Sequence, residues 1–387
     1  MQAFLLLVCA CAAVSASPTS AALVDIFTSG TSTNSWSKGK AVTYRIPCLV
    51  ESNGVLLAFV SERLSSSTDE SDTNIVQRRS TDAGATWSNT TLVVSAEVDP
   101  PFAAKHAFIS SAPWAVADAA TGDVLMFYNQ NSTSTEKCDC NVWYVRTSDG
   151  GLSWSKPVPI PPSSGVYGSS LNTGITLRSG AHKGRLVMCM RRICKNSCPG
   201  PWQSYAAYSD DHGASWRTSP FLAEGSTECQ VTELSTGAVY MSIRPYKELQ
   251  TRSLGRRASA VSADGGASFG PIKFEPQLVN AGGVDGSVVT HCTADGAPSK
   301  TLFYSHPDAG GRSNMTLYMS TDDARTWWSA QQVWGGAAAY SSLAMLPLPP
   351  TGAAAEGAPG GAGCRVGLAF EKGGYESIAF AAITAPC

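Results

Sequence analysis

The stretch STDAGATW at residues 80–87 is the first of five copies of one phrase, Ser/Thr-x-Asp-x-Gly-x-x-Trp, which we call the Asp-box. The other copies are TSDGGLSW (147–154), SDDHGASW (209–216), SADGGASF (262–269) and STDDARTW (320–327). Each residue type suits a tight β-hairpin turn. The Asp accepts hydrogen bonds from backbone N–H groups, the Gly adopts a positive φ, and the aromatic ring packs over the hairpin. Two copies depart from this pattern, through Phe269 and Ala324.

The spacing of the boxes predicts the architecture. Their aspartates are Asp82, Asp149, Asp211, Asp264 and Asp322, and a recurrence of about 60 residues is typical of a repeat fold. Each interval holds short runs rich in Val, Ile, Tyr and Phe, such as VLLAFVS (55–61), VLMFYN (124–129), AVYMSIR (238–244) and TLFYSH (301–306). About four strands per interval make a propeller blade. We therefore predict an all-β, six-bladed β-propeller over residues 23–387, whose sixth blade lacks a recognisable box.

The beginning of the chain resembles an export signal. Residues 3–14 are apolar, and Val14-Ser15-Ala16 fits a small-residue cleavage site. We predict a signal peptide over residues 1–16, with cleavage as late as Ala22 as the alternative. No other run approaches the length needed to span a bilayer. Secretion is expected, or delivery to a lysosome-like or other endomembrane lumen.

Cysteines and glycosylation sequons agree with export. Of 12 cysteines, two lie in the predicted signal, and the remaining ten allow up to five disulfides whose pairing the sequence leaves open. Acceptor sequons begin at Asn89, Asn131 and Asn314, in segments predicted to be surface turns. No metal site is indicated, because the cysteines lack C-x-x-C spacing.

Charge and composition exclude some classes of partner. The net charge is −2, and the densest basic stretch, RSLGRRAS (252–259), lacks interleaved aromatic residues. Nucleic-acid binding is therefore not expected. The Ala/Gly-rich stretch at residues 351–363 is predicted to be a flexible loop within the last blade. We expect a monomer.

Between the boxes stand further short phrases, each at a strand end or in a loop. They are YRIP (44–47), SER (61–63) with the polar loop SSSTDESDTN (65–74), ECQ (228–230), IR (243–244), GR (311–312), AYSSL (339–343) and FE (370–371). This ordered set, together with the Asp-boxes, resembles the exo-α-sialidase (neuraminidase) family with Asp-box (BNR) repeats. The resemblance runs from about residue 44 to residue 380. It implies a retaining hydrolase that releases terminal sialic acid from glycoproteins, glycolipids or oligosaccharides.

The resemblance implies a site near the propeller axis that binds the sialic acid carboxylate. Several guanidinium groups can hold such an anion through charge-assisted, often bidentate hydrogen bonds. Arg45, Arg244 and Arg312 match the three arginines of the family. Arg63 matches a further basic residue near the sugar. Glu371 matches the carboxylate that orients the first arginine, here Arg45.

The resemblance also implies the catalytic groups. The family uses a tyrosine nucleophile, an exception to the two-carboxylate scheme of glycosidases, and Tyr340 matches it. A phenol with an ordinary pKa near 10 needs a neighbouring base. Glu228 matches that base, with Glu233 as the alternative. Asp69 matches the general acid in a loop, with Asp72 as the alternative.

Two other functions fit the same phrases. A trans-sialidase would pass the sugar to a galactoside acceptor instead of water. A sialic-acid-binding lectin would keep the arginines but is expected to lose the nucleophile or the acid, and this chain has Tyr340, Glu228 and Asp69. The chemistry implied by the resemblance requires no metal or organic cofactor.

Overall fold

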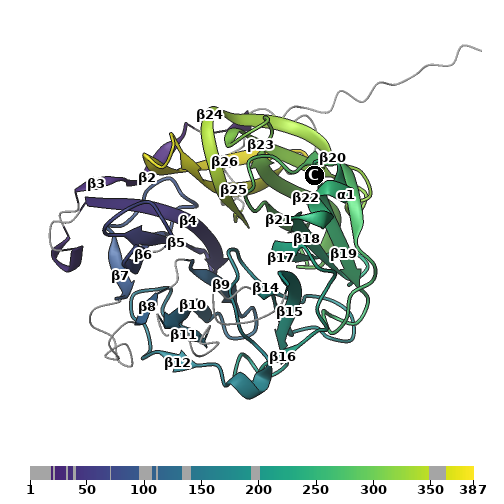
Figure 1. The fold of residues 1–387 in the computed structure, drawn as a ribbon, viewed down its shortest axis with the longest axis horizontal. Helices are drawn as coiled ribbons and strands as arrows, with labels where there is room; N and C mark the ends of the chain where they lie inside the picture. The colour runs from purple at the N-terminus through teal and green to yellow at the C-terminus, as the bar shows by residue number, and fades with distance from the viewer. Residues whose placement is uncertain are drawn as a thin grey trace, which may run out of the picture.

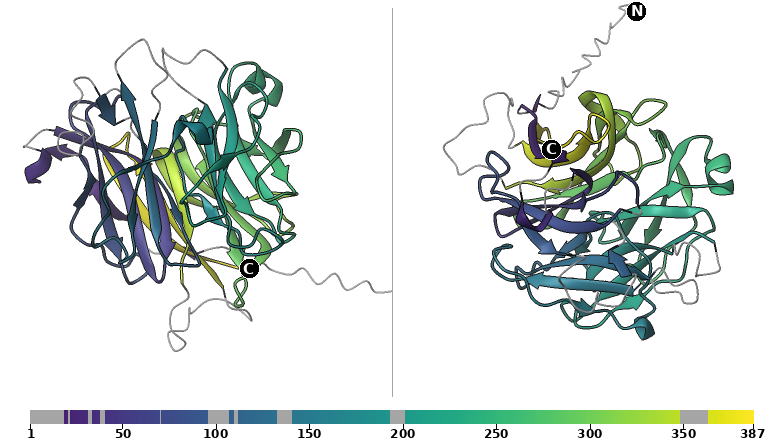
Figure 2. Two further views of the ribbon diagram at one scale, coloured as in Figure 1. Left: turned by 90° about the horizontal axis from the view of Figure 1, so that it is seen from below. Right: turned by 60° about the vertical axis from the view of Figure 1, so that its left-hand side comes forward.

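The computed structural model describes residues 19–20, 22–31, 34–37, 41–69, 71–95, 107–109, 112–132, 141–192, 201–347 and 363–387. These residues form an all-β molecule in which five antiparallel sheets surround a common centre, as in a propeller (Figure 1). A view turned by 90° shows the strands running between the two faces of this disc (Figure 2). The predicted signal peptide and residues 351–362 of the predicted loop lie outside the described residues.

Four sheets are separate blades. The first contains β3 (Gly30–Thr31), β4 (Ala41–Ser52), β5 (Val55–Arg63), β6 (Thr73–Ser80) and β7 (Thr91–Val94). The second contains β8 (Ala107–Ile109), β9 (Trp114–Ala117), β10 (Val124–Ser132), β11 (Asn141–Thr147) and β12 (Val158–Pro159). The third contains β13 (Ile175–Thr176), β14 (Leu186–Arg192), β15 (Gln203–Ser209) and β16 (Arg217–Thr218). The fourth contains β17 (Ser226–Glu233), β18 (Val239–Pro245), β19 (Arg256–Ser262) and β20 (Lys273–Val279).

The remaining strands form one eight-stranded sheet. It contains β1 (Thr19–Ser20), β2 (Val24–Thr28), β21 (Ser287–Cys292), β22 (Pro298–Pro307), β23 (Ser313–Ser320), β24 (Trp328–Met345), β25 (Cys364–Lys372) and β26 (Ser377–Ala385). The prediction of six separate blades is therefore wrong for the described residues, which give four blades and this larger sheet. The reason is β24, which pairs with β23 through its first half and with β25 through its second.

The described residues contain little helix. They hold two 3-10 turns, Ser35–Ser37 and Pro162–Ser164, and one six-residue α-helix, α1 (Glu248–Ser253). The four runs predicted as strands coincide with parts of β5, β10, β18 and β22, and the run at 238–244 begins one residue before β18. Within the described part of the chain, no helix is both long and apolar enough to cross a membrane.

Apolar side chains from adjacent sheets form the cores between blades. Phe59 of β5 and Tyr128 of β10 are both fully buried in one such cluster. A further cluster gathers segments from around the ring, namely Ile46, Ala112, Leu171, Val284, Ala339 and Tyr340. Burial of apolar surface between blades is the main force that favours this arrangement. The last cluster is the one that contains a predicted site residue, Tyr340.

The Asp-boxes form the predicted turns. In the first, Asp82 accepts a 2.9 Å hydrogen bond from the Thr86 N–H, and Gly84 has φ +88°. The first box directly follows β6 and packs on the neighbouring eight-stranded sheet, since a Cβ on Gly84 would lie 2.1 Å from Phe380 of β26. Hydrogen bonds from Thr86 lower the pKa of Asp82, in keeping with a structural carboxylate. Ala324 of the fifth box adopts the left-handed conformation, with φ +61°.

Two disulfides lie among the described residues, Cys189–Cys229 and Cys364–Cys387. Cys48 and Cys292 are free thiols among the described residues, and the cysteines at 138, 140, 194 and 198 lie outside them. Of the predicted glycosylation sites, Asn89 lies on an exposed loop before β7. The other two sequons do not lie in the predicted turns, because Asn131 is in β10 and Asn314 is in β23.

Candidate active site

The phrase YRIP forms a bulge in the inner strand β4. The pairing of β4 with β5 shifts between Arg45 and Cys48, and Ile46 takes a left-handed backbone conformation with φ +53°. This conformation is costly for a β-branched residue and persists only where the surroundings hold it. Here the Ile46 N–H donates a 2.8 Å hydrogen bond to Oε1 of Glu371. The bulge thus sets the direction of the Arg45 side chain.

Glu371 is a buried carboxylate that joins two predicted site residues. It lies in β25 and is 1% exposed. Its Oε1 accepts a 2.5 Å hydrogen bond from Nε of Arg45, and its Oε2 accepts one of 3.1 Å from the Tyr340 N–H. The expected contact between Arg45 and Glu371 is therefore present, and Glu371 also fixes the backbone of Tyr340.

Tyr340 contacts Glu228, although the two residues are 112 positions apart in the chain. The Tyr340 hydroxyl donates a 2.7 Å hydrogen bond to Oε1 of Glu228, which lies in β17. Both side chains are almost completely buried. Burial and the negative charge of Glu228 raise the pKa of Tyr340 well above its ordinary value. The phenol is therefore protonated at neutral pH and needs an acceptor for its proton before it can attack a carbon atom.

Two guanidinium groups hold Glu228. Arg244, at the end of β18, donates a 2.6 Å hydrogen bond to Oε2, and Arg191, near the end of β14, donates one of 2.9 Å to Oε1. Burial pushes the pKa of Glu228 upward, but the charges of Arg244 and Arg191 outweigh it, and the pKa lies below its ordinary value. Glu228 is therefore ionised and can accept a hydrogen bond from Tyr340.

Arg312 lies beside the same tyrosine. The guanidinium carbons of Arg312 and Arg45 are each 5.7 Å from the centre of the Tyr340 ring. Nε of Arg312 donates a 3.0 Å hydrogen bond to the Gly282 carbonyl. The three predicted arginines therefore gather around Tyr340, although they come from β4, from β18 and from the loop before β23.

Two consecutive glycines allow Arg244 and Arg312 to approach each other. Gly282 and Gly283 have φ values of +64° and +58°. A Cβ on Gly282 would lie 2.9 Å from Cγ of Arg312, and a Cβ on Gly283 would lie 2.9 Å from Nη2 of Arg244. The backbone conformation and the close contacts both favour glycine at these positions.

Tyr375, in the turn between β25 and β26, contacts two of the arginines. The guanidinium of Arg45 lies 3.9 Å from the centre of its ring, within the range of a cation–π interaction. The Tyr375 hydroxyl accepts a 2.5 Å hydrogen bond from Nη1 of Arg312. Tyr375 therefore links Arg45 to Arg312 at the edge of the site.

Arg63 and Asp69 complete the group of predicted residues. Nη2 of Arg63 donates a 2.9 Å hydrogen bond to Oδ1 of Asp69. The Ser67 carbonyl accepts hydrogen bonds from both Arg63 and Arg45, which connects this pair to the rest of the site. The side chain of Arg63 is fully buried, whereas that of Asp69 is 63% exposed on its loop. Asp69 thus stands at the solvent side of the arginine group.

The alternative residues occupy other environments. Glu233 accepts hydrogen bonds from the Arg178 and Ser179 N–H groups and from the Ser179 hydroxyl, so it stabilises a turn. Asp72 is exposed, and its carbonyl accepts a hydrogen bond from the Leu64 N–H. By contrast, Glu228 contacts Tyr340, and Asp69 contacts Arg63.

A cluster of buried polar side chains lies next to the site. Arg257 donates a 3.2 Å hydrogen bond to Asp285, and both side chains are fully buried. Burial raises the pKa of Asp285 to about 6, against the opposing effect of Arg257. Nδ1 of His306 lies 2.7 Å from the Pro307 carbonyl oxygen, and burial lowers the pKa of this imidazole to about 3. These residues are close to the site but contact none of Tyr340, Arg45 and Arg312 directly among the described contacts.

The described residues offer one cluster of possible metal ligands, formed by His291, Cys364 and Cys387. The two cysteines form a disulfide. Since a metal ion binds thiolates, these sulfur atoms are not available as ligands while the disulfide is intact.

Sequence reasoning missed Arg191, Tyr375, Gly282 and Gly283. Arg191 follows Cys189 by two positions, and an arginine pair at the end of an apolar strand is a weak signal. The GG pair immediately precedes Val284-Asp285-Gly286. Two adjacent glycines between strands indicate a tight turn, but they do not indicate which side chains approach it.

Comparison with known proteins agrees with this geometry. The family model for the BNR repeat-like domain matches residues 54–348, well over half of the chain. The chain is 33% identical over 325 residues to the sialidase of Micromonospora viridifaciens, covering 79% of this chain and 48% of that protein. It therefore spans about half the length of that relative. It is 27% identical over 376 residues to sialidase-2 of Rattus norvegicus, covering 88% of this chain and 92% of the relative.

Solved structures share the fold. The Hadza microbial sialidase Hz136 superposes with a TM-score of 0.67 at 24% identity, covering 88% of this chain and 65% of that one. The sialidase of Trypanosoma rangeli in complex with the inhibitor DANA gives a TM-score of 0.67 at 18% identity, covering 95% of this chain and 60% of that one. At such identities the likeness concerns the fold alone. The family match and the curated relatives show that the chain belongs to the sialidase family of glycoside hydrolases that carry BNR repeats.

Proposed function

We propose that this protein is a secreted, retaining exo-α-sialidase that hydrolyses terminal sialic acid from glycoproteins, glycolipids or oligosaccharides through a tyrosyl-enzyme intermediate. The observation that carries the proposal is the hydrogen bond between Tyr340 and Glu228, which lies within a group of three arginines. A buried phenol paired with a carboxylate, next to cations that can bind a substrate carboxylate, suits attack on an anomeric carbon that carries a carboxylate of its own.

Substrate binding is assigned to the arginines. Arg45, Arg244 and Arg312 would surround the sialic acid carboxylate with charge-assisted hydrogen bonds. Glu371 and Tyr375 hold two of these side chains in position before the substrate arrives. Little rotamer entropy then remains to be lost when the substrate binds. Arg63 keeps the Asp69 loop next to Arg45 through the shared Ser67 carbonyl.

The first chemical step would form the tyrosyl-enzyme. The Tyr340 oxygen attacks the anomeric carbon and transfers its proton to Glu228. The glycosidic bond breaks at the same time, and Asp69 gives its proton to the departing oxygen. Asp69 is exposed and paired with Arg63 in the unliganded site. Its acid role therefore requires the protonated carboxyl group to reach the leaving oxygen once substrate occupies the site.

The second step would reverse these transfers. The Asp69 carboxylate takes a proton from a water molecule as that water attacks the anomeric carbon. The bond to the Tyr340 oxygen breaks, and Glu228 returns the proton to the phenolate. Two displacements at one carbon retain its configuration, and both carboxyl groups end in their starting states.

The charge of the substrate would assist the first step. Glu228 is a poor base in the empty site because Arg244 and Arg191 favour its ionised form. A substrate carboxylate next to Arg244 adds a negative charge close to Glu228. A like charge raises the proton affinity of a carboxylate. Substrate binding would therefore make Glu228 a better acceptor for the Tyr340 proton.

Three expectations about the whole chain accompany this proposal. We propose that the eight-stranded sheet acts as the fifth and sixth blades, which β24 joins. We propose removal of residues 1–16 on export, because this leaves β1 paired with β26, whereas cleavage at Ala22 would remove β1. We also propose that the mature protein acts as a monomer outside the cell or in the lumen of an endomembrane compartment.

The proposal is tested by release of free sialic acid from sialyllactose by the purified mature protein between about pH 4 and pH 7. Release establishes the hydrolase. If excess labelled lactose instead yields labelled sialyllactose, the protein is a transferase. Binding of sialyllactose by folded protein without either product would establish a lectin and reject the hydrolase.

The assignment of the nucleophile is tested with Tyr340→Phe. This variant keeps the ring that lies near Arg45 and Arg312 but loses the hydroxyl that contacts Glu228. We expect kcat to fall by at least about three orders of magnitude, with an unchanged circular dichroism spectrum. Full activity in this variant would exclude Tyr340 as the nucleophile.

A further inference from the structure

Arg191 is the guanidinium group in the site to which no role has yet been given. It lies in β14, and its side chain is 17% exposed. Its Nη1 bonds to Oε1 of Glu228, and the same oxygen accepts the hydrogen bond from Tyr340. Arg244 bonds to the other oxygen, Oε2. The two arginines are therefore not equivalent, because Arg191 contacts the atom that would receive the phenol proton.

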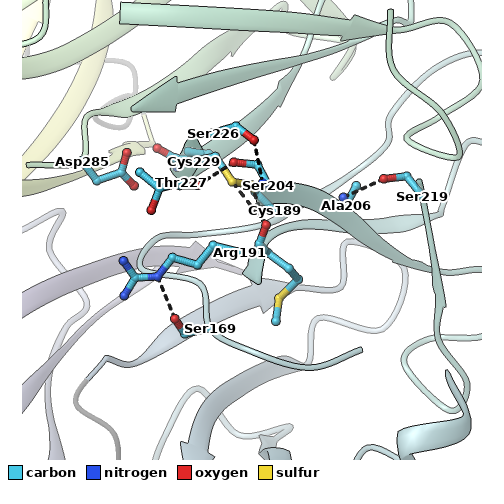
Figure 3. Close-up of a disulfide and its surroundings, with 12 residues drawn as sticks. Ser169, Cys189, Arg191, Ser204, Ala206, Ser219, Ser226, Thr227, Cys229 and Asp285 are labelled. Atoms are coloured by element: carbon cyan, nitrogen blue, oxygen red, sulfur yellow. Dashed lines mark hydrogen bonds between the residues drawn. A yellow bond between two sulfur atoms is a disulfide. The ribbon is translucent and has the colours of Figure 1, made fainter. Parts of the chain in front are cut away.

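The Arg191 side chain is held by groups outside the substrate-binding arginines. Its Nε donates a 2.8 Å hydrogen bond to the Ser169 hydroxyl (Figure 3). The backbones of Arg191 and Ser169 also exchange hydrogen bonds in an isolated β-bridge. Gly168 makes this approach possible, because a Cβ at that position would lie 2.1 Å from the Arg191 carbonyl oxygen. Arg191 is thus fixed in its orientation before any ligand binds.

A disulfide joins the strands that carry Arg191 and Glu228. Cys189 lies two positions before Arg191 in β14, and Cys229 directly follows Glu228 in β17. Cys189 and Arg191 lie on the same strand, and Figure 3 shows the Arg191 guanidinium extending away from the disulfide. The covalent bond limits separation of the two strands. It therefore limits the distance between the guanidinium and the carboxylate.

The charged and titratable groups that face Glu228 come from every neighbouring element. Arg191 comes from β14, Arg244 from β18 and Tyr340 from β24. The charge of Asp285, just before β21, interacts with Glu228 as well. Arg244 must also bind the substrate carboxylate under the proposed function. Arg191 is then the cation that remains on Glu228 throughout the reaction.

We propose that Arg191 is a positioning residue that fixes Oε1 of Glu228 against the Tyr340 hydroxyl and keeps Glu228 ionised at acidic pH. This inference rests on the proposed function for its kinetic test. Its consequence is a working range that extends to lower pH than Glu228 would support with Arg244 alone. A residue that only filled space at this position would not affect that range.

The test compares the pH profile of kcat/KM for wild-type protein, Arg191→Gln and Arg191→Lys, with sialyllactose as substrate. An opposite charge within hydrogen-bonding distance changes the pKa of a carboxylate by about one unit or more. In Arg191→Gln we therefore expect the acidic limb of the profile to move upward by about one pH unit. Arg191→Lys keeps a positive charge, so its acidic limb should lie between those of the wild type and Arg191→Gln.

The matched control is Arg192→Gln. Arg192 is the next residue of the same strand, and its guanidinium lies 5.3 Å from the Phe221 ring centre, away from Glu228. Loss of this arginine should leave the acidic limb where it is in the wild-type protein. An acidic limb in Arg191→Gln that coincides with that of the wild type would overturn the proposal, even if the rate were lower at every pH.

A second readout does not depend on turnover. With ¹³C-labelled glutamate carboxyl groups, the NMR signal absent from Glu228→Gln identifies Glu228, and its titration can be followed in each variant. We expect this signal to titrate at higher pH in Arg191→Gln than in the wild type. Equal titration would overturn the proposal. Failure of the wild type to release sialic acid would count against the proposed function alone, because the NMR result still decides the role of Arg191.

Discussion

Glu371 and Arg45 are separated by 326 positions in the chain, yet Oε1 of Glu371 lies 2.5 Å from Nε of Arg45. The same carboxylate accepts hydrogen bonds from the Ile46 and Tyr340 N–H groups. Glu371 therefore holds the left-handed bulge that orients Arg45 and the backbone that carries Tyr340. It joins the first inner strand to the last sheet, where the ends of the chain meet.

Removal of Glu371 should destabilise the contact between β4 and the eight-stranded sheet. In Glu371→Ala, Arg45 stays buried without its counter-charge, and breaking a buried ion pair in this way costs about 3–5 kcal/mol. We expect the free energy of unfolding, measured by chemical denaturation, to fall by that amount. Lys372→Ala is the control on the same strand, because its pair with Asp25 is partly exposed and is worth about 1 kcal/mol or less. Equal losses in the two variants would contradict the role given to Glu371.

Substitution in the Gly282-Gly283 pair should lower activity as well as stability. In Gly283→Ala, the new Cβ meets Arg244 at 2.9 Å, and we expect kcat/KM to fall about tenfold, which corresponds to about 1.4 kcal/mol. Gly180→Ala is the matched control. Gly180 has φ +70° with no atom within 4 Å of an added Cβ, so it has the same backbone cost of about 1–2 kcal/mol without the contact. If both variants kept full activity, Arg244 would not depend on Gly283.

Asp69 should matter most for poor leaving groups. An alkoxide leaving from sialyllactose needs a proton, whereas a nitrophenolate leaves without one. We expect Asp69→Asn to lower kcat/KM for sialyllactose by about 10²–10⁴-fold and to lower it far less for an aryl sialoside. Asp72→Asn, three positions further along the loop, serves as the control and should be close to wild type with both substrates. An equal loss with both substrates would argue against Asp69 as the acid.

Much of this architecture could be predicted from local sequence. An Asp-box is a short-range device: Asp82 bonds within its own turn, so the sequence contains all that is needed to recognise it. The strand runs could be recognised for the same reason, because a short run of Val, Ile, Tyr and Phe between turn residues is a local pattern. The number of separate sheets is different. It depends on β24 continuing from one partner strand to the next, and no single phrase encodes that continuity.

The residues of the site also fall into two groups, those that local sequence could predict and those that it could not. Arg45, Glu228 and Tyr340 stand in phrases that resemble a known family, so they could be named before their contacts were known. Arg191 and Tyr375 stand in no such phrase, and their roles arise only from the folded chain. Arg191 reaches Glu228 because two strands pack together, and Tyr375 reaches Arg312 because a turn of the last hairpin lies beside the site. Such contacts between distant segments leave little trace in one sequence.

The buried histidine below the site should make stability depend on pH. His306 is 1% exposed, and its pKa is lowered to about 3 in the folded protein by burial and by the charge of Arg257. In the unfolded chain a histidine has a pKa of about 6.5. Between these values the unfolded state binds a proton that the folded state does not. The contribution of His306 therefore destabilises the fold as pH falls below about 6.5.

The variant His306→Asn should remove this dependence. Relative to neutral pH, we expect the wild type to lose about 1.4 kcal/mol at pH 5.5 through His306, and the variant to lose correspondingly less. Asp285 acts in the opposite direction, since its pKa is raised to about 6 and the folded state takes up its proton first. Asp285→Asn should therefore lose more unfolding free energy between pH 7.5 and pH 5.5 than the wild type does. His306→Asn should lose less. Urea denaturation at pH 7.5 and pH 5.5 measures both effects, and identical pH dependence in all three proteins would show that neither buried group titrates as described.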